Sequence, residues 1–175
     1  MRRRSSSRGT SGFSFGDGTV SPEALVTRAV ALGYSALGIT DTADLGGIPR
    51  FVNAALQSGK LRPIVGAELR VDGRPAAFIV RTPEGYRNLA ALVTRGRMGA
   101  WASWTKQHGQ ERRGRPNVTW REVAELSAGL VALTGPATGP IASLVRAGDR
   151  ANARHRLDEW RDVFGERLAV EVQLH

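Results

Sequence analysis

Residues 21–47 read SPEALVTRAVALGYSALGITDTADLGG, and this stretch decides the fold class. Ser21 and Pro22 form a helix start, because a hydroxyl can cap the first turn and proline is favoured at its first position. Apolar residues then recur at helical spacing as far as Gly33, where we expect the helix to end. Residues 34–40 form an apolar, strand-like run, and a polar loop follows at 41–47. The stretch therefore predicts a helix, a buried strand and a loop, in that order.

The same alternation continues along the chain. Further helices are expected at 49–58, from Thr82 onward, at 119–127 and at 149–164; further strands are expected at 64–71, 76–80, 130–134 and 168–174. Asp72-Gly73 predicts a hairpin turn between two of these strands. The third helix is expected to bury one face, made of Tyr86, Leu89, Ala90 and Val93. Strands that alternate with helices favour an α/β fold with a mostly parallel sheet and the helices outside it.

Two later helices carry clear start signals. Thr119 and Glu122 match a capping box, and Asp149 is a good N-terminal cap. The helix after Asp149 has a helical stripe of Ala153, Leu157, Trp160 and Phe164. Trp120 and Trp160 therefore belong to helix faces, and core packing is the interpretation we favour for both.

Composition excludes several classes of protein. At 175 residues with 41% hydrophobic and 23% charged residues, the chain has the balance of a globular domain with a real core. It has no cysteine, which excludes disulfides and thiolate-bound metal centres. No run approaches the ~18 apolar residues that span a bilayer, and no apolar segment follows the basic start, so neither a membrane location nor secretion is indicated. We expect a cytoplasmic protein.

The chain is strongly basic. Lys and Arg number 25 against 16 Asp and Glu, a net charge of +9, and all but two of the basic residues are arginine. Such an excess attracts polyanions, of which DNA is the obvious candidate. A GC-rich genome also favours arginine codons, so the excess alone does not decide between these explanations.

Two segments stand apart from the regular pattern. Residues 1–12 consist mainly of Arg, Ser and Gly, which predicts a flexible basic arm before a domain at 13–175. Residues 96–117 have no clear period and are expected to be a long basic surface excursion. The excursion carries the residues that could stack on and track single-stranded DNA: Trp101, Trp104, Lys106, Arg112, Arg113 and Arg115. A solvated loop is the simpler alternative.

Carboxylates follow three of the expected strands. Asp17 comes after the position of a first strand, Asp41 follows the strand at 34–40, and Glu68 lies in the strand at 64–71. In α/β proteins the loops after strand ends usually build the site, and gathered carboxylates suit hard divalent ions. Taken singly, such an aspartate is more often a helix cap or a loop stabiliser.

Five blocks in order resemble one family. They are FSFGDGTVSPEALVTRAVALGYSALGITDTADLGGIPRF (13–51), LRPIVGAEL (61–69), TPEGYRNLAALVTR (82–95), GLVALTGPATGPIASLVRAGD (129–149) and FGERLAVEVQLH (164–175). They resemble the PHP (polymerase and histidinol phosphatase) domain that opens the alpha subunit of bacterial DNA polymerase III and its error-prone relatives, a nucleotidyltransferase family. The resemblance implies an α/β fold, here an incomplete or distorted (β/α)7 barrel of PHP type, with a Zn, Mn or Mg centre in active members.

The sequence departs from the family at the metal ligands. Arg8 and Thr10 stand where the family has H-x-H, and Thr40-Asp41-Thr42 stands where it has T-D-H. Pro136 replaces a further Cys or His. Asp17, Asp41 and Glu68 match retained family positions, but arginine cannot ligate a metal and imidazole nitrogens supply much of the affinity for such ions. We therefore expect a vestigial, degenerate metal site, no catalytic residues and no cofactor.

The three histidines do not restore the site. His108, His155 and His175 have no metal-ligand spacing to one another. His175 matches a histidine in the family's last block, which suggests a shared strand end rather than catalysis.

Three functions remain open. The first is a non-catalytic structural PHP module at the front of a polymerase subunit that serves DNA replication or error-prone repair synthesis, with DNA and the rest of the subunit as partners. The second is a metal-dependent phosphoesterase or 3′–5′ exonuclease, and the third is a basic nucleic-acid-binding module. The family's domain continues beyond the equivalent of His175, so the chain is interpreted as a fragment. Its exposed last strand (Leu168, Val170, Val172) predicts self-association.

Overall fold

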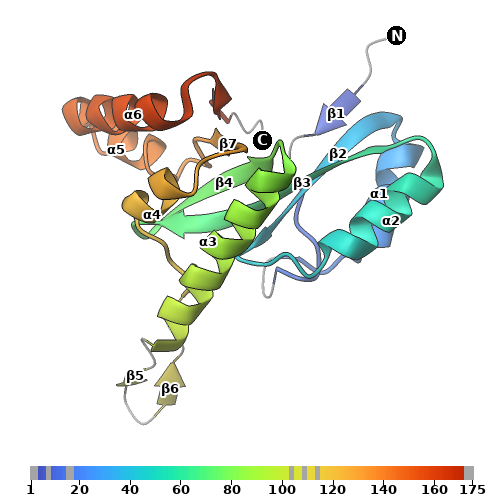
Figure 1. Ribbon diagram of the computed structural model, residues 1–175, viewed down its shortest axis with the longest axis horizontal. Coiled ribbons are helices and arrows are strands. Elements are labelled where there is room, and N and C mark those ends of the chain that lie inside the picture. Colours follow the sequence, from blue (N-terminus) through green and yellow to red (C-terminus); the bar gives the residue numbers. More distant parts are fainter. Residues whose placement is uncertain are drawn as a thin grey trace. The chain divides into compact units, whose positions relative to one another are not determined.

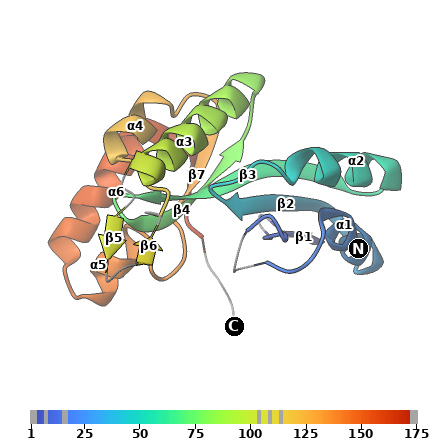
Figure 2. The ribbon, with the colours of Figure 1, turned by 90° about the horizontal axis from the view of Figure 1, so that it is seen from below.

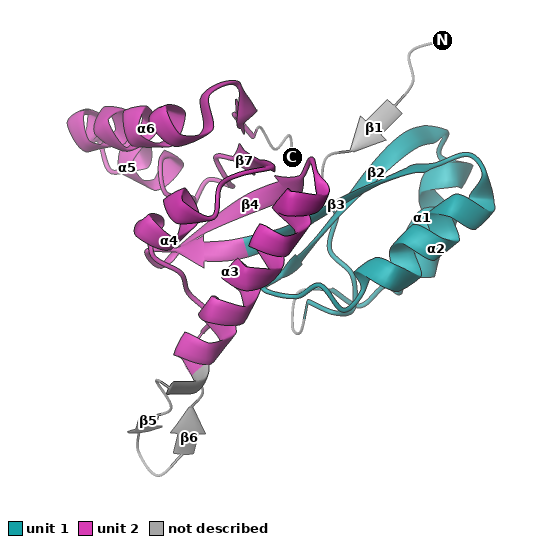
Figure 3. Ribbon diagram, viewed as in Figure 1, with its two compact units in different colours: residues 1–68 teal, residues 69–175 magenta. Residues whose placement is uncertain are grey.

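A computed structural model describes residues 4–6, 9–14, 18–102, 105–107, 110–112 and 115–171. For residues 4–6, 101–102, 105–107 and 110–112 the description covers the backbone alone. The chain divides into two compact units, residues 1–68 and 69–175 (Figure 3), and each unit is described by itself.

The first unit is a parallel β/α arrangement. Its elements are β1 (Arg4–Ser6), α1 (Pro22–Ala31), β2 (Tyr34–Thr42), α2 (Ile48–Ser58) and the start of β3 (Arg62–Val71), which runs on into the second unit (Figure 1). β2 pairs in parallel with both β1 and β3, as the alternation of strand and helix predicted. β1 lies within residues 1–12, the segment expected to be a flexible arm. Three residues of that segment therefore pair with the backbone of β2, which departs from the expectation.

The expected helix ends of this unit are confirmed. The Ser21 hydroxyl accepts a hydrogen bond from the Ala24 amide at 3.2 Å, which caps α1. Gly33, one residue after the C-cap of α1, has φ of 76° and Gly59, the C-cap of α2, has φ of 60°. Glycine adopts this left-handed conformation without a steric penalty, and this is why both helices stop where they do.

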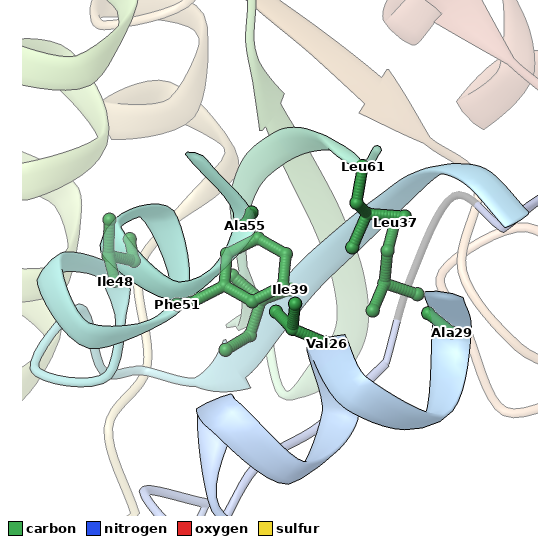
Figure 4. Close-up of a cluster of buried hydrophobic side chains, with 8 residues drawn as sticks. All are labelled: Val26, Ala29, Leu37, Ile39, Ile48, Phe51, Ala55 and Leu61. Carbon is green, nitrogen blue, oxygen red and sulfur yellow. The ribbon is translucent and has the colours of Figure 1, made fainter. Parts of the chain in front are cut away.

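α1 and α2 lie side by side and bury a shared apolar core against β2 (Figures 2 and 4). The cluster consists of Val26, Ala29, Leu37, Ile39, Ile48, Phe51, Ala55 and Leu61. Phe51 is completely buried and Ile39 is 1% exposed. Burial of each such large side chain contributes about 1.5–3 kcal/mol, so this cluster holds the first unit together.

The second unit contains more irregular elements. After β3 they are β4 (Arg74–Val80), α3 (Pro83–Ala102), β5 (Thr105–Gln107), β6 (Gln110–Arg112), α4 (Trp120–Glu125), β7 (Leu130–Leu133), α5 (Ala142–Arg146), α6 (Arg150–Phe164), a 3₁₀ turn (Gly165–Arg167) and β8 (Leu168–Ala169). The loop at residues 135–140 was expected to lead into a helix, and α5 follows it. The sequence pattern did not predict the 3₁₀ turn, which is shorter than the two helical turns that an apolar period needs to show itself.

The sheet is mixed, so the expectation of a mostly parallel sheet holds only in part. β7 and β8 are parallel, but β4 and β7 are antiparallel. Asp72 and Gly73 form the predicted hairpin turn, with φ of 46° and 80°. A two-residue turn can join only antiparallel strands, so it reverses β4 relative to β3.

Three further expectations need qualification. In the segment expected to be a basic surface excursion, residues 96–102 continue α3 and residues 105–107 pair with 110–112 as a hairpin, so part of it has regular structure. Tyr86 is 40% exposed, whereas Leu92 on the same helix is completely buried with Leu89. β8 covers only Leu168–Ala169 of the strand expected at 168–174, and residues 172–175 lie outside the described ones.

Aromatic rings form the core of the second unit. Trp120 stacks on Trp160 with ring centroids 5.1 Å apart, and Phe78 stacks on the same indole at 6.2 Å. Phe164 tilts against all three rings. Trp160 is completely buried, so the core assignment of the two tryptophans is confirmed.

Arg167 ties the end of α6 to the loop before β7. Its guanidinium donates to the carbonyls of Ser127 and Leu130 at 2.7 and 2.9 Å, and to that of Val163 at 3.1 Å. The carbon of the same group lies 5.5 Å from the Phe164 ring centre. A rigid fork of donors suits three carbonyls in this way, and lysine does not reproduce it.

Gly129 provides a test of backbone packing, with Gly148 as its matched control. Both have positive φ, 70° and 78°. A Cβ at Gly129 would lie 2.2 Å from the Thr82 hydroxyl and 2.6 Å from the Gly85 nitrogen, whereas a Cβ at Gly148 meets nothing within 4 Å. Gly148→Ala should cost about 1–2 kcal/mol of unfolding free energy for the conformation alone. Gly129→Ala should cost clearly more in urea denaturation, and equal losses would contradict the close approach.

Candidate functional site

The side chain of Asp41 lies at the centre of the candidate site. It stands near the end of β2 and is 2% exposed. Its Oδ1 accepts hydrogen bonds from the Ser11 amide at 2.6 Å and from the Ser14 hydroxyl at 2.8 Å. Its Oδ2 accepts one from the Ser11 hydroxyl at 2.7 Å. Three donors from one short segment therefore satisfy a buried carboxylate.

The backbone of the same segment also bonds to β2. The Thr40 amide donates to the Gly9 carbonyl at 2.8 Å, and the Thr42 amide donates to the Ser14 hydroxyl at 3.0 Å. The Phe13 amide donates to the Ser11 hydroxyl at 3.2 Å. Residues 9–14 are therefore fixed along the end of β2 on both sides of Asp41.

Gly47 leaves the space that the carboxylate needs. A Cβ at this position would lie 3.1 Å from Asp41 Oδ2, 3.2 Å from the Ser11 hydroxyl and 2.9 Å from the Phe13 ring. Its φ is −75°, which any residue can adopt. Close approach, rather than backbone conformation, is therefore the reason for glycine at the start of α2.

Asp41 and Glu68 do not converge. In the parallel pairing of β2 and β3, Asp41 is opposite Ala67 and Thr42 is opposite Glu68. Because successive side chains of a strand point to opposite faces, Glu68 lies on the face of Thr42 and Asp41 lies on the other. Asp41 shares its face with Leu37 and Ile39, which pack under α1 and α2.

The face that carries Glu68 offers hydroxyl oxygens. Thr40 is completely buried there, and its Oγ1 has no hydrogen-bond partner in the described part of the chain. A single ordered water is the usual partner of such a group. Hydroxyls are weak metal ligands, so Thr40 and Thr42 do not replace imidazole on this face.

Several predicted site residues cannot be placed. Asp17 and Arg8 lie outside the described residues, as do Trp104, Arg113, His108 and His175. The side chains of Trp101, Lys106 and Arg112 are not described either, whereas Arg115 is exposed. The hairpin β5–β6 contains Lys106 and Arg112, and the proposed contact of these six residues with DNA stays a prediction.

The other positions of the family motif carry no ligand set. Thr10 is exposed, and Pro136 is half-buried in a loop where its carbonyl accepts a hydrogen bond from the Gly139 amide at 2.8 Å. His155 lies on α6, exposed, with Nε2 3.7 Å from a Glu159 oxygen.

The residues present do not fit a metal cluster. Among the described residues, no three His, Cys, Asp or Glu side chains gather in a way that could hold an ion. A carboxylate has about four lone-pair sites, and Asp41 commits three of them to protein donors. Only about one lone-pair site of Asp41 is therefore left for a metal ion.

Sequence reasoning missed the partners of Asp41. Ser11, Ser14 and Gly47 carry no local signal of their role, because the two serines lie 30 and 27 positions before the carboxylate that they contact. The general expectation that an aspartate after a strand stabilises a loop was the nearest clue.

Comparison with known proteins identifies similar chains. The model of the PHP domain family matches residues 8–175. The chain is 32% identical over 168 residues to DNA polymerase III subunit alpha of Pseudomonas aeruginosa, covering 92% of this chain and 13% of that protein. It is 37% identical over 169 residues to an error-prone DNA polymerase of Anaeromyxobacter sp. (strain K), covering 93% and 13%.

A third relative and one solved structure extend the comparison. The error-prone DNA polymerase of Xanthomonas oryzae pv. oryzae (strain PXO99A) is 35% identical over 167 residues, which is 94% of this chain and 14% of the relative. This chain thus spans roughly one seventh of these polymerases. A candidate metal-dependent phosphoesterase from Bifidobacterium adolescentis has a TM-score of 0.57 at 14% identity, covering 95% of this chain and 86% of that one, and shares the fold.

Asp41→Asn tests the structural role of the carboxylate. The amide turns one acceptor into a donor that faces a serine donor, and bonds to a charged group contribute about 1.5–3 kcal/mol each. We expect a loss of about 3 kcal/mol in unfolding free energy by circular dichroism in urea, with faster hydrogen exchange at the Ser11 and Thr42 amides. The control is Asp158→Asn, an exposed site with the same chemical change, which should stay within about 0.5 kcal/mol of the parent. A variant at Asp41 as stable as that control would refute the role.

Proposed function

The chain belongs to the PHP domain family, and from this premise we propose that it is a non-catalytic, structural PHP module with a degenerate metal site. The observation that carries the proposal is the state of Asp41. Both of its oxygens accept hydrogen bonds from Ser11 and Ser14 inside the first unit. A retained acid of the family motif is thereby used as a structural acceptor.

The energetic argument favours the same role. Removing the donors around a buried carboxylate leaves a charge without partners, which costs about 3–5 kcal/mol. A metal ion would have to offset this loss with Asp41 as its ligand and with no imidazole at Thr10 or Thr42. Glu68 on the opposite face cannot share an ion with Asp41 unless the strands change register.

We further propose that the described strands are part of the distorted (β/α)7 barrel of the family. The parallel pairs β1–β2, β2–β3 and β7–β8 support this, together with the helices that follow β2 and β7. The antiparallel pair β4–β7 is the distortion.

The proposed partners are the rest of a polymerase subunit and DNA. Support comes from the relatives, which are named as DNA polymerase III alpha and error-prone DNA polymerase and are far longer than this chain. We propose a role in replication or error-prone repair synthesis in the bacterial cytoplasm. In the part of the chain that is described, no helix is long and apolar enough to cross a membrane.

Metal analysis with an activity assay tests the main proposal. The 175-residue chain is loaded with Zn²⁺, Mn²⁺ or Mg²⁺, dialysed, and assayed for bound metal and for hydrolysis of bis(p-nitrophenyl) phosphate. We expect substoichiometric metal and no turnover, because Asp41 already accepts three hydrogen bonds and Glu68 lies on the other face of the sheet. Stoichiometric metal with turnover that Glu68→Gln removes would overturn the proposal in favour of a metal-dependent phosphoesterase or exonuclease.

We also propose that the 175-residue chain associates with itself through its last strand. β8 is the last strand of its sheet, and Val170 directly after it is 74% exposed. Unpaired strand edges with apolar side chains promote association, and a lysine at such an edge opposes it. Sedimentation should show larger species as concentration rises, and Val170→Lys should reduce them. Val145→Lys, at an exposed apolar site on α5, should not; a parent that stays monomeric at high concentration would contradict the expectation.

A further inference from the structure

The charges along α5 and α6 are sharply divided. Residues 146–156 contain four arginines and His155 against one acid, Asp149, whereas residues 157–167 contain four acids against two arginines. The first half is therefore strongly positive and the second is negative. We propose that the positive half, Arg146, Arg150 and Arg154, is a docking surface for the phosphate backbone of duplex DNA.

This distribution opposes the helix dipole. The N-terminus of a helix carries partial positive charge, which favours acids in the first turn and bases in the last. α6 has no acid in its first turn and begins with Arg150 itself. Arg150 and Arg154 are also four residues apart, where like charges repel. Helix stability does not account for Arg150 and Arg154. An anionic partner does, because its negative charge would relieve both the unfavourable interaction with the dipole and the repulsion between the two guanidinium groups.

Two other helices place their charges as the dipole favours. α1 has Glu23 in its first turn and Arg28 in its last. α4 has Glu122 in a complete capping box. Exposed charges that the stability of their own helix does not explain are typical of a functional surface.

The three arginines are placed to act together. Arg150 and Arg154 lie on one face of α6, about 6 Å apart along its axis, and all three are exposed. Arg146 ends α5, which packs against α6 (Figure 2). Their side chains make no ion pair or hydrogen bond within the described residues, whereas Arg156 on the same helix pairs with Glu159 at 3.2 Å and lies 3.7 Å from Asp72.

The acids near this surface do not cancel it. Asp149 is occupied as the cap of α6: its carboxylate accepts from the Asn152 amide at 3.1 Å and from the Asn152 side chain at 2.6 Å. These bonds, led by that of the side chain, lower the pKa of Asp149 below its usual value, so it stays ionised and bound to the helix. Asp158, the next exposed acid, lies one turn beyond Arg154.

The surface chemistry favours duplex over single-stranded DNA. Single strands are held by aromatic side chains that stack on unpaired bases. The two large aromatic residues of α6, Trp160 and Phe164, are buried in the core, so the helix exposes no indole or phenyl ring on which an unpaired base could stack. Arginine binds phosphate oxygens through its fork of donors without reading the base sequence. The inference does not depend on the loss of the metal site.

Salt-dependent DNA binding tests the surface. The triple variant Arg146→Gln, Arg150→Gln, Arg154→Gln is compared with Lys60→Gln, Arg62→Gln, Arg81→Gln, which removes the same charge from three exposed sites outside the helices. Affinity for a random-sequence duplex and for a poly-dT strand is measured between low and physiological salt. Each lost phosphate contact should reduce the slope of log K against log salt by about 0.9 for duplex DNA.

The α5–α6 triple should therefore lose roughly two to three units of slope on the duplex, and the control triple should keep the parent slope. Arg150→Gln alone should melt at or above the parent temperature, because Arg150 stands in the first turn of α6 and opposes its dipole, whereas Arg146 lies in the last turn of α5, where the dipole favours it. Equal losses in both triples, a duplex slope that the α5–α6 triple leaves unchanged, or tighter binding to the single strand than to the duplex would each overturn the proposal.

Discussion

The hydrogen bonds between the buried Asp41 carboxylate and the serines of residues 9–14 are the constraint on which the candidate site depends. A charge that is 2% exposed is tolerated in a protein only when donors surround it. Ser11 and Ser14 supply three. The arrangement also determines the neighbouring backbone, since the Thr42 amide bonds to the same Ser14 hydroxyl and Gly47 must remain without a side chain.

This network gives Asp41 a structural role that does not depend on metal binding. A residue kept only as a ligand has no further role once the other ligands are replaced. Asp41 has an independent one, because it holds the N-terminal segment against the end of β2. Glu68 lies on the other face of the sheet, and its carbonyl accepts a hydrogen bond from the Ala43 amide at 2.8 Å.

Local signals in the sequence predicted the regular elements well. The cap at Ser21, the capping box at Thr119, the turn at Asp72-Gly73 and the stops at Gly33 and Gly59 each involve residues close in the chain, and each is confirmed. The site depends on distant pairs instead. Nothing near Ser11 indicates a carboxylate 30 residues away, and nothing near Asp41 indicates that the strand register places it opposite Ala67 and away from Glu68.

Expectations also failed where a weak local pattern was overridden by packing. α3 runs on through residues 96–102 because Gly96 and Ala100 are buried, Gly96 close to Val118 and Asn117, which a search for apolar periodicity does not weigh. α6 is the opposite case, because its pattern was predicted correctly. Its buried stripe of Ala153, Trp160 and Phe164 is enough to form the helix. Asp149 at its start and Arg161 in its last turn suit the dipole, whereas Arg150 in the first turn works against it, and we attribute that charge to a partner of the exposed side rather than to the fold.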